Sequence, residues 1–162
     1  MMEDLESSPV LTRVHDALAA RYPESLSEWT FEKGELTAIV RSDALVEVLV
    51  CLKGELGFIA LNDMIGLDNM NIGDGRKRFS VLYQLYRFPA ADRIRLRVDI
   101  GEGETLPSIY FLYRSSDWAE REIYDMFGIV FKGHPDLRRI YMPEEFDGHP
   151  LRKDFPLEGR NP

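Results

Sequence analysis

Three carboxylates close together in the sequence could in principle do chemistry. Glu120, Glu122 and Asp125 are neighbours, and paired carboxylates with separated pKa values are a common acid–base device. On an α-helix, however, Glu120 and Glu122 point about 200° apart, so they do not converge on one substrate atom. Catalysis by this chain alone is therefore not expected, and a stand-alone small hydrolase is the weakest functional hypothesis.

Histidine and cysteine give no stronger signal for a metal or cofactor. His134 and His149 are each followed by proline, with no adjacent thiol or helical histidine partner, so a structural hydrogen bond is favoured over a metal site. Cys51 is the one cysteine, which excludes an internal disulfide and an iron–sulfur cage built from this chain alone. Its apolar neighbours indicate a small core residue. We expect no catalytic, metal-binding or cofactor-binding residue in this chain.

The overall charge disfavours nucleic acid and anionic membranes as partners. Twenty basic and twenty-eight acidic residues give a formal net charge of −8, which disfavours binding to nucleic acid or to an anionic bilayer. The sequence contains no apolar run of about eighteen residues that could span a membrane. An acidic start with Glu3 and Asp4 is unlike a signal peptide. We expect a soluble, unexported chain without direct membrane insertion.

A helix is expected to carry the three carboxylates. The step from Asp117 to Glu120 resembles a capping box, and Gly128 can end the helix. Helical periodicity separates an apolar side, which would pack on a sheet, from a side that carries charge beside an aromatic ring. The apolar side contains Ala119, Ile123 and Met126. The charged side contains Trp118, Arg121, Glu122 and Asp125.

The first half of the chain reads as one helix and one hairpin. Ser8 followed by Pro9 is a start signal with a hydroxyl cap, and this helix should end before Pro23. Residues 29–40 follow an extended pattern, with Lys33-Gly34 as the turn.

Residues 42–75 give mixed signals for helix, strand and loop. Residues 42–53, with Ser42 or Asp43 as a cap, fit a helix or a strand, and we favour the helix. Residues 58–65 are ambiguous. Residues 66–75 are rich in Asn, Asp and Gly and indicate a surface loop.

The clearest β signal is an antiparallel pair, residues 79–88 and 93–100, joined through Pro89 to Asp92. In the second strand, apolar residues alternate with Arg93, Arg95 and Arg97. A solvated polar face is favoured for this arginine row over a grip on an acidic partner. The fold class is therefore α+β, a single domain over residues 1–127 with a mainly antiparallel mixed sheet flanked by helices.

Residues 128–162 show no helical or strand period, and glycines and prolines interrupt them throughout. A structureless stretch of this length indicates disorder or a binding segment. Large apolar side chains favour binding, because disordered chains lack them. These are Ile129, Val130, Phe131, Leu137, Ile140, Tyr141, Met142, Phe146, Leu151, Phe155 and Leu157. An imperfect repeat, Gly133 to Arg139 and Gly148 to Asp154, places an aliphatic anchor before adjacent charges in each copy. We expect an extended, partner-wrapping C-terminal segment.

Three motifs in this region carry a family resemblance: EREIYDMFGI from Glu120, HPDLRRI from His134 and GHPLRKDFPL from Gly148. The chain resembles the C-type subunits of respiratory complex I, NADH:quinone oxidoreductase. Members of this family are also known as the thirty-kilodalton iron–sulfur-fraction subunit and, in chloroplasts, as the J-type subunit. Tyr141 stands where relatives often carry an aliphatic residue.

The resemblance implies a non-redox structural subunit of the peripheral arm. Its C-terminal segment would clasp the large subunit of the D or 49 kDa type that forms the quinone pocket, beside subunits of the B, I and possibly G types. Iron–sulfur clusters, quinone, and FMN where an NADH-input module is present would belong to those partners. The resemblance adds Glu120 to the charged helical face and implies these partner-binding residues: Trp118, Glu120, Arg121, Glu122, Asp125, His134, Arg138, Arg139, His149, Arg152 and Asp154.

The sequence of one subunit does not identify which membrane complex contains it. Equivalent subunits occur in ferredoxin-, deazaflavin- and hydrogenase-linked membrane complexes, and the electron donor binds elsewhere. The expected location is peripheral, on the cytoplasmic side of a bacterial inner membrane, or on the matrix or stromal side in an organelle. The tail is expected to become ordered only against its partner.

Overall fold

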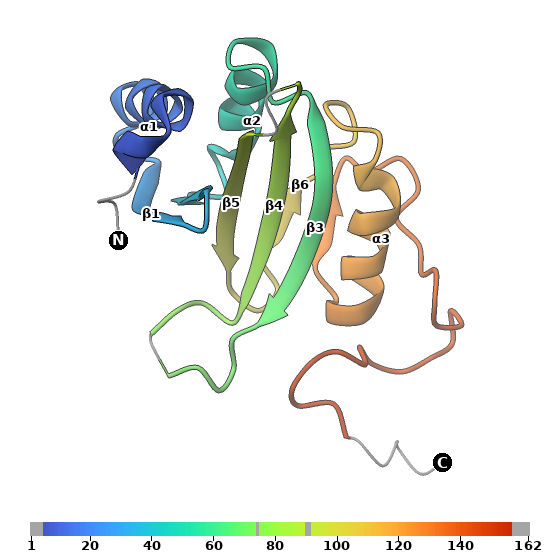
Figure 1. Ribbon diagram of the computed structural model, residues 1–162. Helices are drawn as coiled ribbons and strands as arrows, with labels where there is room; N and C mark the ends of the chain where they lie inside the picture. The colour runs from blue at the N-terminus through green and yellow to red at the C-terminus, as the bar shows by residue number, and fades with distance from the viewer. Residues whose placement is uncertain (1–4, 74, 90–91, 157–162) are drawn as a thin grey trace.

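The computed structural model describes residues 5–73, 75–89 and 92–156. Figure 1 shows a curved sheet with α1 and α2 near one end and α3 beside β3. In chain order the elements are a short 3-10 helix (Leu5–Ser7), α1 (Pro9–Arg21), β1 (Leu26–Glu32), β2 (Glu35–Val40), α2 (Leu45–Gly54), β3 (Ala60–Asp68), β4 (Phe79–Arg87), β5 (Asp92–Ile100), β6 (Thr105–Pro107), α3 (Ser116–Phe127) and β7 (Val130–Lys132).

The main sheet has five strands in the order β1-β2-β5-β4-β3. The pairs β1/β2, β4/β5 and β3/β4 are antiparallel, and β2/β5 is parallel. A mainly antiparallel mixed sheet flanked by helices is the predicted α+β fold class, which is confirmed. A second, two-stranded parallel sheet joins β6 to β7.

One face of the main sheet forms the core, because the alternating side chains of β4 and β5 are buried there. The opposite face carries the arginine row, and its charges are paired within the sheet. Arg95 donates to Glu35 at 2.6 Å, and Arg97 donates to Asp99 at 2.6 Å. Arg93 lies over the Tyr86 ring. The row is therefore a polar sheet face whose cations are mostly satisfied by the chain itself.

Helices α1 and α2 occur where the sequence predicts them, but their caps differ. Ser8 is the N-cap residue of α1, yet its hydroxyl makes no capping hydrogen bond. Ala44, rather than Ser42 or Asp43, caps α2. Cys51 is buried in the core cluster, as expected. None of the helices in the described ranges is long and apolar enough to cross a membrane.

The expected surface loop at residues 66–75 is wrong at its start, because β3 continues through Asp68. Packing explains the difference: a Cβ on Gly66 would lie 2.8 Å from the Phe127 ring. Gly66 thus lets α3 approach β3 closely, and the glycine that suggested a loop is a packing residue. In the predicted connection between the two antiparallel strands, Ala90 and Ala91 lie outside the described residues.

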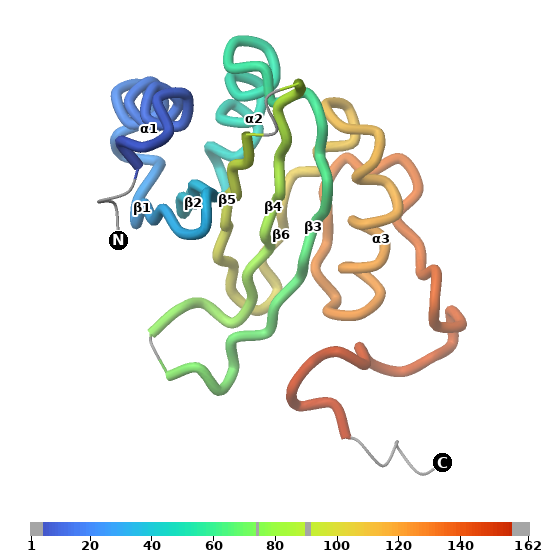
Figure 2. Tube along the Cα trace, viewed as in Figure 1, coloured from blue at the N-terminus to red at the C-terminus, as the bar shows by residue number. Residues whose placement is uncertain are grey.

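The expectation that no regular structure follows Gly128 is wrong for β7. Its central residue Phe131 and the preceding Ile129 are buried in the core. From Gly133 to Pro156 the chain has turns and bends but no helix or strand. It passes around α3 and returns below the sheet, as the orange-to-red trace in Figure 2 shows. Residues 157–162, the end of the predicted tail, lie outside the described part. The tail was expected to order only against a partner, but in the single chain it already lies against α3.

Candidate functional site

Helix α3 is the element on which the predicted site residues converge. It begins at Ser116 after the N-cap residue Ser115, and Gly128 ends it in the left-handed conformation, with φ 76°. The predicted ending is confirmed and the predicted capping box is wrong, because Asp117 lies inside the helix. Its expected charged face is also wrong in part, since Glu120 and Asp125 are both 0% exposed.

Glu120 holds the loop that precedes its own helix. Its Oε1 accepts the backbone N–H of Ile109 at 2.8 Å and the hydroxyl of Ser116 at 3.0 Å. Its Oε2 and the hydroxyl of the fully buried Tyr83 both lack a hydrogen-bond partner. Burial raises the pKa of Glu120, although these hydrogen bonds oppose the shift. The side chain is an internal structural group.

Asp125 anchors the tail to α3. Its Oδ2 accepts three consecutive backbone N–H groups, those of Ile140, Tyr141 and Met142, at 3.0, 2.8 and 3.0 Å. Its Oδ1 accepts from Arg139 at 2.9 Å. Burial raises the pKa of Asp125, but the three N–H groups and the arginine charge outweigh it, so the pKa lies below its ordinary value. The carboxylate is ionised and fully bonded by the tail.

The two copies of the repeat bind opposite ends of the same helix through their histidines. His134 Nε2 lies 3.3 Å from the carbonyl oxygen of Asp117, and its Nδ1 accepts the N–H of Asp136. The Nε2 atom of His134 therefore carries the proton. His149 Nδ1 lies 2.9 Å from the carbonyl oxygen of Asp125 and donates to it. Both rings serve as structural donors, as the sequence predicts.

The second repeat also caps the end of α3. The carbonyl of Met126 accepts the N–H of Leu151 at 3.2 Å, and the carbonyl of Phe127 accepts Arg152 Nε at 2.6 Å. With His149 on Asp125, three terminal carbonyls find donors in the tail, which supplies the partners that a helix end lacks. A Cβ on Gly128 would lie 2.6 Å from His149 Nε2, so only glycine allows this approach.

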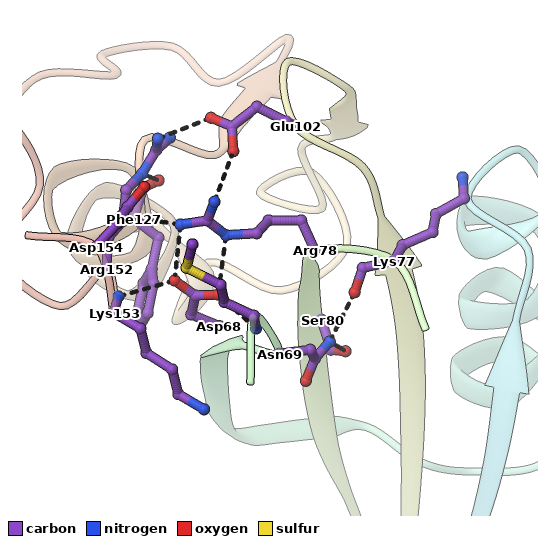
Figure 3. A network of polar contacts seen from close by, with 11 residues as sticks. Asp68, Asn69, Lys77, Arg78, Ser80, Glu102, Phe127, Arg152, Lys153 and Asp154 are labelled. Atoms are coloured by element: carbon purple, nitrogen blue, oxygen red, sulfur yellow. Dashed lines mark hydrogen bonds and ion pairs between the residues drawn. The ribbon is translucent and has the colours of Figure 1, made fainter. Parts of the chain in front are cut away.

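A second buried carboxylate, Asp68 at the end of β3, holds the last part of the tail (Figure 3). It pairs with Arg78 at 3.0 Å and accepts the N–H of Lys153 at 2.9 Å. Arg78 also pairs with Asp154, and Arg152 with Glu102. Burial raises the pKa of Asp68, and the bonds from Arg78 and the backbone lower it below its ordinary value. Sequence reasoning missed Asp68 and Arg78, because Asp68 was assigned to a loop.

Four predicted residues, together with Tyr141, lie toward the surface where the tail meets α3. Trp118 is 66% exposed and stacks with Arg121, whose guanidinium lies 5.1 Å from the ring centroid. Arg121 donates to the carbonyl of Arg138, and the side chain of Arg138 is 62% exposed. The Tyr141 hydroxyl lies 3.5 Å from Glu122. We name these five residues the outer strip.

The structure thus divides the predicted partner-binding residues into two groups. Trp118, Arg121, Glu122 and Arg138 lie on the outer strip. The others make contacts within the chain, and these are Glu120, Asp125, His134, Arg139, His149, Arg152 and Asp154. Within the described ranges, no group of three or more metal-ligand side chains could hold a metal ion.

A mixed sheet, one surface helix and a tail anchored to that helix define the class: α+β proteins with an extended C-terminal segment. The model of one such family, described as "Respiratory-chain NADH dehydrogenase, 30 Kd subunit", matches residues 38–161. The chain belongs to this family.

Individual relatives agree with the family. The C-type subunit of the NADH-quinone oxidoreductase of Geotalea uraniireducens is 41% identical over 143 residues, which are 88% of this chain and 85% of the relative. A solved structure titled "Nqo5 of the trypsin-resistant fragment (1-134)" superposes with a TM-score of 0.71 at 34% identity, covering 79% of this chain and 99% of that one. A chain of an archaeal membrane-bound sulfane sulfur reductase shares the fold at 18% identity, with a TM-score of 0.75, covering 90% and 85%.

Proposed function

We propose that this chain is a non-redox structural subunit of the peripheral arm of a proton-translocating NADH:quinone oxidoreductase. Family membership and relatives named as the C-type subunit of that enzyme support the assignment. The structural role is supported chiefly by the outer strip. These side chains remain available to a partner, whereas most other polar groups of the tail bind within the chain. Tryptophan, tyrosine and arginine are the residue types enriched at the energetic centres of protein interfaces.

The proposed partner is the large subunit of the D or 49 kDa type that forms the quinone pocket, with B-, I- and possibly G-type subunits as further neighbours. Iron–sulfur clusters, quinone, and FMN where an NADH-input module is present would lie in those subunits. The chain would sit peripherally on the cytoplasmic face of a bacterial inner membrane. The expected division into residues 1–127 and 128–162 is moved in this proposal to Lys132, because Ile129 and Phe131 are buried in the core of the domain.

A related complex is the second candidate, because the fold also occurs in an archaeal sulfane sulfur reductase. At 18% identity that likeness concerns the fold alone, whereas relatives of about 40% identity are named for NADH and quinone. The NADH-linked complex is therefore favoured. Genes encoded beside this one would separate the alternatives, since the subunit that binds the electron donor differs between them.

Charge reversal at two adjacent arginines tests the docking role. Arg138→Glu should weaken co-purification with the co-expressed large subunit at least tenfold and leave the melting temperature of the free chain unchanged, because Arg138 is exposed. Arg139→Glu should lower that melting temperature, because its guanidinium binds the buried Asp125. The measurements are size-exclusion co-elution and thermal melts.

A matched control is Arg13→Glu, an exposed residue on α1, which should affect neither property. Undiminished binding by Arg138→Glu and by Trp118→Ala would remove the outer strip from the interface. Loss of stability in the free Arg138→Glu chain, equal to that of Arg139→Glu, would mean that both arginines serve the fold.

A further inference from the structure

The tail is attached to the domain mainly by polar contacts. From Lys132 to Pro156 the buried side chain is a polar one, His134, and the apolar residues are at most half-buried. Leu137 and Met142 pack against the core, and Phe146 stacks on Phe155 within the tail. Tyr141 and Leu151 are 59% and 54% exposed. Because little apolar area is covered, hydrophobic burial contributes less to holding this segment than it does in the sheet.

The polar contacts concentrate on one side chain. Asp125 receives four donors from residues 139–142, and each is bonded to an ionised, fully buried group. Hydrogen bonds to a charged acceptor are about twice as strong as neutral ones. Asp68 receives a single backbone donor from the tail, the N–H of Lys153. Asp125 therefore carries the largest share of the attachment.

Asp125 also lies apart from the core contacts of its helix. The apolar side of α3 packs on β3 through Ile123 and Phe127 at Gly66. Asp125 lies between those two residues in the sequence. Its carboxylate, however, takes its hydrogen bonds from the tail and not from the sheet. Loss of its charge would thus remove bonds to the tail and leave the packing of α3 on the sheet in place.

We infer that Asp125 is a latch that holds residues 139–142 of the tail in place on the free chain before any partner binds, and that neutralising it releases these residues while the sheet and helices stay folded. The latch also assembles the outer strip, because Arg138 and Tyr141 come from the tail and Arg121 and Glu122 from α3. This second part rests on the proposed docking function. A preformed strip loses less conformational entropy on binding than a disordered one.

Amide hydrogen exchange on the full-length free chain tests the latch. In the wild type, the amides of residues 140–142 and 151–153 should be protected. In Asp125→Asn the amides of 140–142 should exchange at least tenfold faster, while those of β4 and β5 are unchanged. Among the tail amides, Asp68→Asn should affect residue 153 alone, and Asp136→Asn, at an exposed carboxylate, should change nothing.

Unprotected wild-type tail amides, or unchanged protection in Asp125→Asn, would overturn the inference. Should Asp125→Asn fail to fold, Arg139→Gln removes the same ion pair from the tail side and should accelerate exchange at residues 140–142. No acceleration in that variant would count against the latch.

Binding to the large subunit separates the two proposals. The latch and the docking role both stand if Asp125→Asn releases the tail and weakens binding. If the tail is released and binding is undiminished, the latch stands and the composite docking surface fails.

Discussion

Glu120 and Asp125 lie on one helix and are equally buried, yet their environments shift the two pKa values in opposite directions. Asp125 is surrounded by donors, so its charged form is favoured. Glu120 has two donors, both on Oε1, and an unpartnered Oε2, so burial outweighs them and raises its pKa. Helical spacing shows that the two side chains do not share a face. It cannot show that both are internal, because burial depends on the tail and on the loop before the helix.

Replacing Glu120 by Gln should therefore stabilise the protein at pH 8 by on the order of 1 kcal/mol. The raised pKa means that folding favours the neutral form, a contribution that is present at low pH and lost as pH rises through the folded pKa. Glutamine keeps an acceptor for Ile109 and Ser116 and removes the buried negative charge. Thermal melts at pH 5 and pH 8 measure the effect, which should shrink at the lower pH. The prediction would be contradicted if Glu120→Gln lowered the melting temperature relative to the wild type, and did so by more at pH 8 than at pH 5.

Acid should loosen the tail through Asp125 and Asp68. Both have lowered pKa values in the folded chain, so their stabilisation is present above the unfolded pKa of about 4 and is lost as pH falls through the folded values. Melting temperatures between pH 5 and pH 3 should fall more steeply for the wild type than for Asp125→Asn. Parallel curves would show that Asp125 does not contribute to acid sensitivity.

At the scale of elements, most strands and helices could be predicted from sequence because their periodicity reflects burial in this chain. The antiparallel pair β4/β5, the hairpin β1/β2 and the end of α3 are such cases. Failures arise where tertiary contacts decide. Gly66 suggested a loop, but it is a strand residue beneath Phe127, and β7 is too short to show a period. The sequence predicted the lack of helix and strand between residues 133 and 156, but the surface of α3 on which the tail lies is not visible in the sequence.

The contact at Gly66 gives a direct test of how α3 is positioned. Gly66→Ala should destabilise the chain by about 2 kcal/mol, because the new Cβ would lie within 2.8 Å of Phe127 and overpack the junction. Gly54→Ala, at the end of α2 with no atom within 4 Å of the added Cβ, is the matched control and should cost little. Urea denaturation measures both. Equal effects would mean that close packing of α3 on β3 is not required.

The whole molecule combines a conventional core with a segment that is attached at its surface. Family membership explains why the C-terminal third has so specific a sequence, and the structure adds that much of this specificity serves contacts inside the chain. The part that faces outward is small and combines two aromatic side chains with three charged ones. The net charge of −8 disfavoured nucleic acid as an expectation, but it could not indicate which charges are buried.

Truncation tests where the domain ends. A chain ending at Lys132 should unfold cooperatively, because β7, Ile129 and Phe131 are retained. A chain ending at Phe127 loses those two buried side chains, each contributing about 3 kcal/mol or more, and should be much less stable. Differential scanning calorimetry compares the two chains. Equal melting temperatures would place the boundary at 127, as sequence analysis suggests.

The two histidine contacts on α3 have a consequence for how this protein can vary. Both rings bind backbone carbonyls, at Asp117 and at Asp125 eight positions later, so they are indifferent to side-chain identity and sensitive to spacing. Eight helical residues span about 12 Å, and one inserted residue would shift the second carbonyl by about 1.5 Å and turn it by about 100°. The two histidine contacts therefore fix the number of residues between these positions of α3: an insertion or deletion there would break one contact even where every side chain is kept.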